Sequence, residues 1–211
     1  MSRAGFGCWA LVFLFSVGVP GSSRADDAVD LAKQALAECN AGRLSTDREV
    51  RIAHFTRGTE LAGKAVAAND LNAEAHFALF CNSGEQLRVD GERITSVLGF
   101  KNMMRELDRT LELNPEYTDA LAAKGQLLVR LPRLLGGDQV RGEAMLHRVL
   151  EKDPRAFSTR LVLARLSDER GERDEALAFA TRALEIAREQ GRADKIAQAQ
   201  ALLAELHGEQ R

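Results

Sequence analysis

Apolar residues recur at helical spacing along most of the chain after residue 25. Good helix formers (Ala, Leu, Glu, Arg and Gln) dominate there, and no segment alternates β-branched or aromatic residues with polar ones as a half-buried strand does. Turn signals divide the chain into segments of helical length: Asn69-Asp70, Asn114-Pro115, Asp153-Pro154, Gly171 and Gly191. The pattern predicts an all-α chain.

The predicted helices come in pairs. The pairs cover about residues 26–70, 71–114, 115–153 and 154–190, and one further helix covers 192–208. This last helix places Ile196, Ala199, Leu203 and Leu206 on one face, as expected of a cap that covers the end of a helix stack. The pairs and the cap account for the chain after residue 25 without a second domain.

Small residues mark the places where the two helices of the last pair cross. Small side chains let two backbones approach closely, and here they are Ala164, Gly171, Ala176, Ala180 and Ala183. The series resembles the tetratricopeptide repeat, a helix-turn-helix unit of about 34 residues. Asn114-Pro115 and Asp153-Pro154 resemble the proline that closes such a unit. The resemblance implies an α-solenoid of about four repeats with a C-terminal capping helix.

The sequence departs from the repeat pattern in one respect, and it also resembles two smaller groups of repeat-like proteins. The large aromatic residue expected early in each repeat is absent, since Leu121 and Arg160 occupy that position in the third and fourth units. The segments AEAHFALFCNSGEQLRVDG and LPRLLGGD are also similar to two tetratricopeptide-like groups. These are the regulators of microtubule dynamics and the periplasmic T-component of TRAP solute transporters.

The N-terminus has the pattern of a secretory signal. An apolar run of twelve residues, 8–19, follows Met-Ser-Arg, within the roughly 7–15 residues of a signal core and below the roughly 20 that span a bilayer. Small residues at Ser23 and Ala25 predict a signal peptide at 1–25, cleaved between Ala25 and Asp26; an uncleaved anchor is the alternative. We therefore expect an exported protein, in a bacterial periplasm, with no membrane span after cleavage.

Charge argues against one class of partner, and the cysteine content allows a disulfide. The chain has 29 Lys plus Arg against 31 Asp plus Glu, so nothing predicts binding to nucleic acid. After cleavage Cys39 and Cys81 remain, in a chain expected to enter an oxidising compartment. They form either a disulfide or two buried thiols; a free thiol with a lowered pKa would instead indicate redox chemistry.

The sequence contains no constellation that predicts catalysis. Its four histidines are never three to five residues apart, so no helix face offers the paired imidazoles of a helical zinc motif. Gly136-Gly137 does not follow a strand, as a phosphate-binding loop would. We expect a protein that is not an enzyme, with no cofactor and no metal.

The register of the repeats places candidate binding residues on the first helix of each pair, facing a concave groove. They are His76, Asn82 and Glu85 in the second unit, Asp119, Gln126 and Arg130 in the third, and Arg165 and Asp168 in the fourth. Gln126, Arg130 and Arg165 are suited to an extended peptide or a carboxylate. The alternative is an ordinary solvated helix face.

Two functions follow as hypotheses. The first is a non-enzymatic scaffold or assembly factor of the cell envelope that binds another protein or an extended peptide. The second is a periplasmic solute-binding accessory of a transporter, with the connections at 83–93 and 131–138 lining a ligand cavity. A closed apolar cavity favours the second hypothesis, and an open groove with polar walls favours the first.

Overall fold

The computed structural model describes residues 21–89 and 97–208, and this part of the chain contains nine α-helices and no strand. The elements are α1 (Gly21–Leu44), α2 (Arg48–Ala68), α3 (Ala73–Val89), α4 (Val97–Leu113), α5 (Thr118–Arg130), the 3₁₀ turn η1 (Arg133–Leu135), α6 (Gln139–Lys152), α7 (Phe157–Glu169), α8 (Arg173–Glu189) and α9 (Ala193–Leu206). The prediction of an all-α fold is confirmed.

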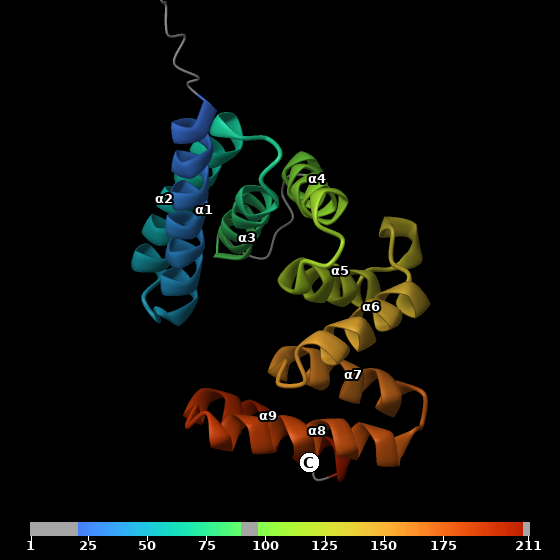
Figure 1. Ribbon diagram of the computed structural model, residues 1–211. Helices are drawn as coiled ribbons and strands as arrows, with labels where there is room; N and C mark the ends of the chain where they lie inside the picture. The colour runs from blue at the N-terminus through green and yellow to red at the C-terminus, as the bar shows by residue number, and fades with distance from the viewer. Residues whose placement is uncertain (1–20, 90–96, 209–211) are drawn as a thin grey trace, which may run out of the picture.

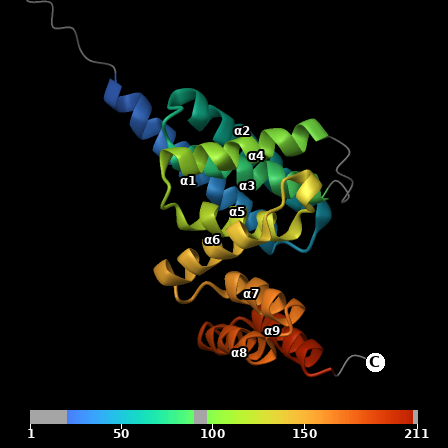
Figure 2. The ribbon, with the colours of Figure 1, turned by 90° about the vertical axis from the view of Figure 1, so that its right-hand side faces the viewer.

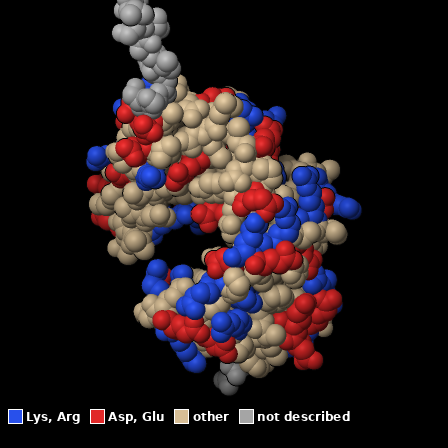
Figure 3. Space-filling model, viewed as in Figure 1, with Lys and Arg blue, Asp and Glu red and all other residues tan. Residues whose placement is uncertain are grey.

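The helix pairs follow one another along a curved path. Figure 1 shows α1 and α2 at one end of the curve and α8 and α9 at the other, with both ends on the same side of the molecule. The space-filling view is hollowed between these two ends (Figure 3). The described helices thus form a curved solenoid.

Side chains cap several of the helices at the turns between them. Asp47 accepts hydrogen bonds from the backbone N–H groups of Glu49 and Val50 at the start of α2. Asn72 does the same at α3, and Asp138 accepts from the N–H of Arg141 at α6. These short polar residues satisfy donors that the first turn of a helix leaves unpaired, so each new helix begins where the turn residues predict.

Small side chains allow the helices of the last pair to pack closely. Ala164 of α7 and Ala176, Ala180 and Ala183 of α8 are fully buried in one apolar cluster. Leu202 and Leu206 of α9 belong to the same cluster. The last helix therefore covers apolar surface that α7 and α8 would otherwise expose to water.

The predicted signal peptide lies mostly outside the described residues. Residues 1–20, which include the whole apolar run, are not described, and the predicted cleavage position between Ala25 and Asp26 falls inside the first turns of α1. Among the described helices, none combines the length and apolar character that crossing a bilayer requires.

Helix α3 packs tightly against both α1 and α2. A disulfide joins Cys39 of α1 to Cys81 of α3, with 6.3 Å between their Cα atoms. The neighbouring Asn82 donates from its amide nitrogen to the carbonyl oxygens of Ala35 and Ala78, both at 2.9 Å. Gly58 of α2 leaves room for this amide, since a Cβ at Gly58 would lie 2.0 Å from Asn82 Oδ1.

We expect Gly58→Ala to destabilise the protein by about 1–3 kcal/mol, because the added methyl overlaps an Asn82 side chain that is fully buried and held by two hydrogen bonds. Gly63→Ala on the same helix is the matched control. A Cβ there meets nothing within 4 Å, so it is expected to stabilise α2 by up to about 1 kcal/mol. Urea unfolding measures both; equal effects would contradict the close approach.

Tyr117 provides a prediction about pH. Its ring lies 4.9 Å from that of Phe77, and burial, with smaller effects of Glu74 and Asp119, raises the pKa of Tyr117 from 10.0 to about 12. The folded state therefore favours the neutral phenol. Its contribution to stability is complete below about pH 10 and is lost as the pH rises toward 12.

Tyr117 is the only tyrosine, so the near-ultraviolet absorbance of tyrosinate reports on it alone. We expect a midpoint near pH 12 in the folded protein and near 10 in denaturant. Tyr117→Phe should remove this contribution to the alkaline loss of stability. A midpoint near 10 in the folded protein would show that the ring is not buried.

Candidate binding cleft

An open cleft of about 460 Å³ lies between α3, α4 and α5. Its apolar lining, called the floor below, includes Phe80 and Leu87 of α3, Met103 of α4 and Leu127 of α5. Its polar and charged lining residues, called the rim below, are Arg43, Glu85, Arg88, Gln126 and Arg130. Figure 2 shows why the rim draws on several helices, since the C-terminal ends of α1, α3 and α5 and the N-terminal end of α4 lie on one side of the molecule.

The rim carries more positive than negative charge. Its single carboxylate, Glu85, is 5% exposed and accepts hydrogen bonds from Arg43 Nε at 2.8 Å and Arg88 Nη1 at 3.1 Å. The side chains of Gln126 and Arg130 make no hydrogen bond or ion pair with any described residue. Three guanidinium groups therefore face one carboxylate, and two polar side chains are available to a ligand.

The structure brings three of the predicted groove residues together in this cleft: Glu85, Gln126 and Arg130. Asp119, Arg165 and Asp168 are exposed, but they do not line it. Arg165 lies 3.7 Å from Glu205, and Asp168 lies 3.3 Å from Arg173. These last residues belong to a salt-bridged helix surface.

The placement of Asn82 in an open groove is wrong, and His76 is almost completely buried. Asn82 is completely buried, and its amide is committed to α1 and to its own helix. His76 is 3% exposed. Both lie on α3, which packs against α1, α2 and α4, and Asn82 therefore faces neighbouring helices and not a groove.

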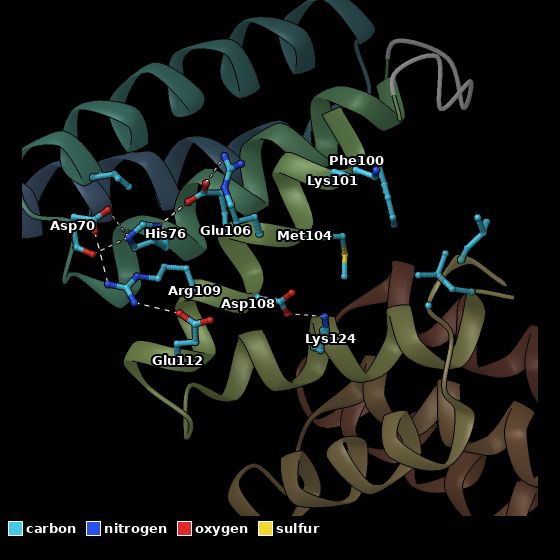
Figure 4. Close-up of a pocket in the computed structure, with 15 residues that line it drawn as sticks. Asp70, His76, Phe100, Lys101, Met104, Glu106, Asp108, Arg109, Glu112 and Lys124 are labelled. Atoms are coloured by element: carbon cyan, nitrogen blue, oxygen red, sulfur yellow. Dashed lines mark hydrogen bonds and ion pairs between the residues drawn. The ribbon is translucent and has the colours of Figure 1, made fainter. Parts of the chain in front are cut away.

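His76 lies at the inner end of a second hollow, of about 780 Å³, between α4 and the connection from α5 to α6. Figure 4 shows the ring between Asp70 and Glu106. Nδ1 lies 2.7 Å from Glu106 Oε2, and Nε2 lies 3.0 Å from the carbonyl oxygen of Asp70. Farther along the hollow Lys124 donates to Asp108 at 2.6 Å. Most charges of this second hollow thus neutralise one another.

Arg43, Arg88 and Met103 also line the cleft and are not among the predicted residues. Arg43 stands at the end of α1, and Met103 belongs to α4, the second helix of its pair. The repeat register selects only first helices, so it does not find Met103. Arg43 and Arg88 lie on first helices, but at their C-terminal ends and outside the positions that the register selects. Within the described residues, no group of three or more His, Cys, Asp or Glu side chains is placed to hold a metal ion.

A curved stack of helix pairs with a concave, partly apolar cleft defines an α-solenoid of the repeat-protein class. Among solved structures, the chain is similar to TTC0263, a thermophilic TPR protein of Thermus thermophilus, with 20% identity and a TM-score of 0.55. That similarity covers 87% of this chain and 98% of TTC0263. The chain therefore has the tetratricopeptide-repeat fold, as its spacing of small residues predicted.

Two other solved structures are less similar. MamA shares 16% identity at a TM-score of 0.45, covering 82% of this chain and 98% of MamA. YrrB, described as a TPR protein with an unusual peptide-binding site, shares 17% identity at a TM-score of 0.38, covering 84% of this chain and 97% of YrrB. No protein-family model matches the sequence, and no curated protein matches it.

Removing the disulfide tests how α3, which forms one wall of the cleft, is held. The two cysteines are 42 residues apart, so Cys39→Ala is expected to destabilise the protein by about 4 kcal/mol through the freedom regained by the unfolded chain. Cys81→Ala and the double variant should lose about the same amount. Urea unfolding with and without reductant measures this loss; an unreduced protein no more stable than the reduced one would contradict the bond.

Proposed function

We propose that this protein is a non-enzymatic scaffold that binds another protein or an extended peptide in the cleft between α3, α4 and α5. The observation that carries the proposal is an apolar floor flanked by Gln126 and Arg130, whose polar atoms have no partner among the described residues. The floor can take an apolar side chain, while the amide and the guanidinium bind backbone carbonyls or a carboxylate. Concave surfaces of helical solenoids generally act in this way.

We propose that the protein acts in the periplasm, where it helps to assemble a complex of the cell envelope. Support for export comes from the apolar run at 8–19 and from the small residues Ser23 and Ala25. The disulfide between Cys39 and Cys81 adds support, because such bonds persist mainly in oxidising compartments. The envelope role itself is an inference from this location together with a binding fold.

The alternative role as a solute-binding accessory has less support. It requires connections predicted at 83–93 and 131–138 to line a ligand cavity. Residues 83–89 belong to helix α3 and not to a connection, and residues 90–93 lie outside the described part of the chain. In the other connection, Leu134 is 98% exposed and Leu135 61% exposed. Side chains so exposed do not line a closed cavity, so an open, peptide-binding cleft is the better interpretation.

Binding of peptides to the intact protein tests the proposal. Peptides selected from a random displayed library on the wild-type protein are titrated by calorimetry against Arg130→Glu and Gln126→Ala. We expect Arg130→Glu to weaken binding about tenfold or more, because a repulsive carboxylate replaces a free cation at the rim. Gln126→Ala should weaken it less.

The matched control is Arg188→Glu on α8, which changes an exposed arginine that has no ion pair with any described residue and lies outside the cleft. It should leave affinity unchanged. Circular dichroism confirms that each variant keeps its helical content. Selected peptides that bind all variants equally would place the binding surface elsewhere, and a library that yields no binder would contradict peptide binding.

A further inference from the structure

Exposed aliphatic side chains gather where α5 turns into α6. This segment, residues 131–141, is called the α5–α6 corner below. Leu134 is 98% exposed, Val140 81% and Leu135 61%, and Leu134 is the most exposed large apolar residue in the described part of the chain. In Figure 1 the corner stands out from the body of the molecule beside α4. Grouped aliphatic side chains in water generally mark a contact surface.

Backbone hydrogen bonds give the corner a defined shape. Pro132 O accepts from the N–H groups of Leu135 at 2.8 Å and Gly137 at 3.1 Å, and the N–H of Asp138 donates to Leu128 O at 2.9 Å. The side chain of Asp138 also caps α6. Leu134 is thus held outward by a closed turn and is not a frayed end.

Three cations lie in the corner or in the hollow beside it. Arg133 and Arg141 belong to the corner, and Lys101 of α4 lines the same hollow as Leu135. None of these three cations has an ion pair with a described residue. Asp138 is the only acid of the corner, and its carboxylate already accepts the backbone N–H of Arg141. Figure 3 shows Lys and Arg side chains on this side of the molecule, with Asp and Glu side chains beside and below them.

We propose that the α5–α6 corner docks on an anionic lipid surface. Leu134 and Leu135 would enter the boundary between headgroups and acyl chains, while Lys101, Arg133 and Arg141 face the lipid phosphates. A fluid bilayer accepts a protruding aliphatic side chain without a preformed pocket, which suits a convex tip. The proposal is independent of peptide binding in the cleft.

Two other occupants fit the corner less well. In a second copy of the chain, the cleft is the apolar hollow that could receive Leu134, but its rim carries three arginines against one glutamate and repels a cationic corner. An acidic protein would match the charge, yet it must also supply a pocket that surrounds Leu134 on all sides. The lipid surface satisfies both requirements at once.

Vesicle binding tests the proposal, with the protein isolated from an exporting host. Vesicles of phosphatidylcholine with one third phosphatidylglycerol are compared with phosphatidylcholine alone, by flotation and by amide hydrogen exchange. We expect binding to the anionic vesicles only, weakened by salt, with slowed exchange confined to the α5–α6 corner. Leu134→Ser with Leu135→Ser should reduce binding about tenfold or more, as expected for two aliphatic side chains removed from the lipid.

Matched variants distinguish binding through the corner from non-specific adsorption of the protein to vesicles. Leu71→Ser removes another exposed leucine, 70% exposed in the turn before α3 and outside the corner, and it should leave vesicle binding unchanged. Arg133→Gln should reduce binding about fivefold, the effect of one cation near an anionic surface, while Lys64→Gln on α2 should not. All of these positions are exposed, so the fold is expected to persist.

Several results would overturn the proposal. Equal binding to neutral and anionic vesicles would show that lipid charge is not recognised. Binding unchanged by the Leu134 and Leu135 substitutions would show that the corner does not contact the lipid. Vesicle binding that leaves amide exchange in the corner unchanged assigns the contact to another segment, such as residues 1–20. Protection of the corner that grows with protein concentration in the absence of vesicles indicates a second copy, and protection by an added acidic protein but not by vesicles indicates a protein partner.

Discussion

The close attachment of α3 to α1 is the constraint on which the binding cleft depends. The disulfide between Cys39 and Cys81 and the amide of Asn82 join the two helices at adjacent positions, and Gly58 lets α2 approach the same point. With its inner side committed to α1 and α2, α3 presents Phe80 and Glu85 toward the cleft. A polar amide and a covalent bond at one crossing also fix the register between helices that burial of alanines alone would leave free to slide.

The remaining helices are positioned from α3 outward. Phe77 of α3 packs with Leu107 of α4 and Ala120 of α5 in one apolar cluster, and Tyr117 contacts the same phenylalanine. This cluster holds the start of α5 against α3 and α4. The helix therefore contributes Gln126 and Arg130 to the cleft before the chain turns outward at the α5–α6 corner.

Charge is distributed unevenly in a protein whose overall formal charge is only -2. Along α7 and α8 the arginines are largely paired, as Arg170 is with Glu143 and Glu172. Around the end of α5, by contrast, Arg130 at the cleft and Arg133 and Arg141 at the corner have no ion pair with any described residue. A partner with negative charge and apolar surface binds where unpaired cations lie beside accessible apolar groups. Both proposed binding surfaces therefore lie at or next to α5.

Local spacing in the sequence determined the helices, their pairing and the tetratricopeptide fold, because the alanines at helix crossings and the prolines after helices act within one repeat. It also selected Glu85, Gln126 and Arg130, which line the cleft. Tertiary structure alone decided that His76 and Asn82 are buried and that Arg43 and Met103 line the cleft. Periodicity shows which residues share a face of a helix, whereas which neighbour covers that face depends on contacts between residues far apart in the chain.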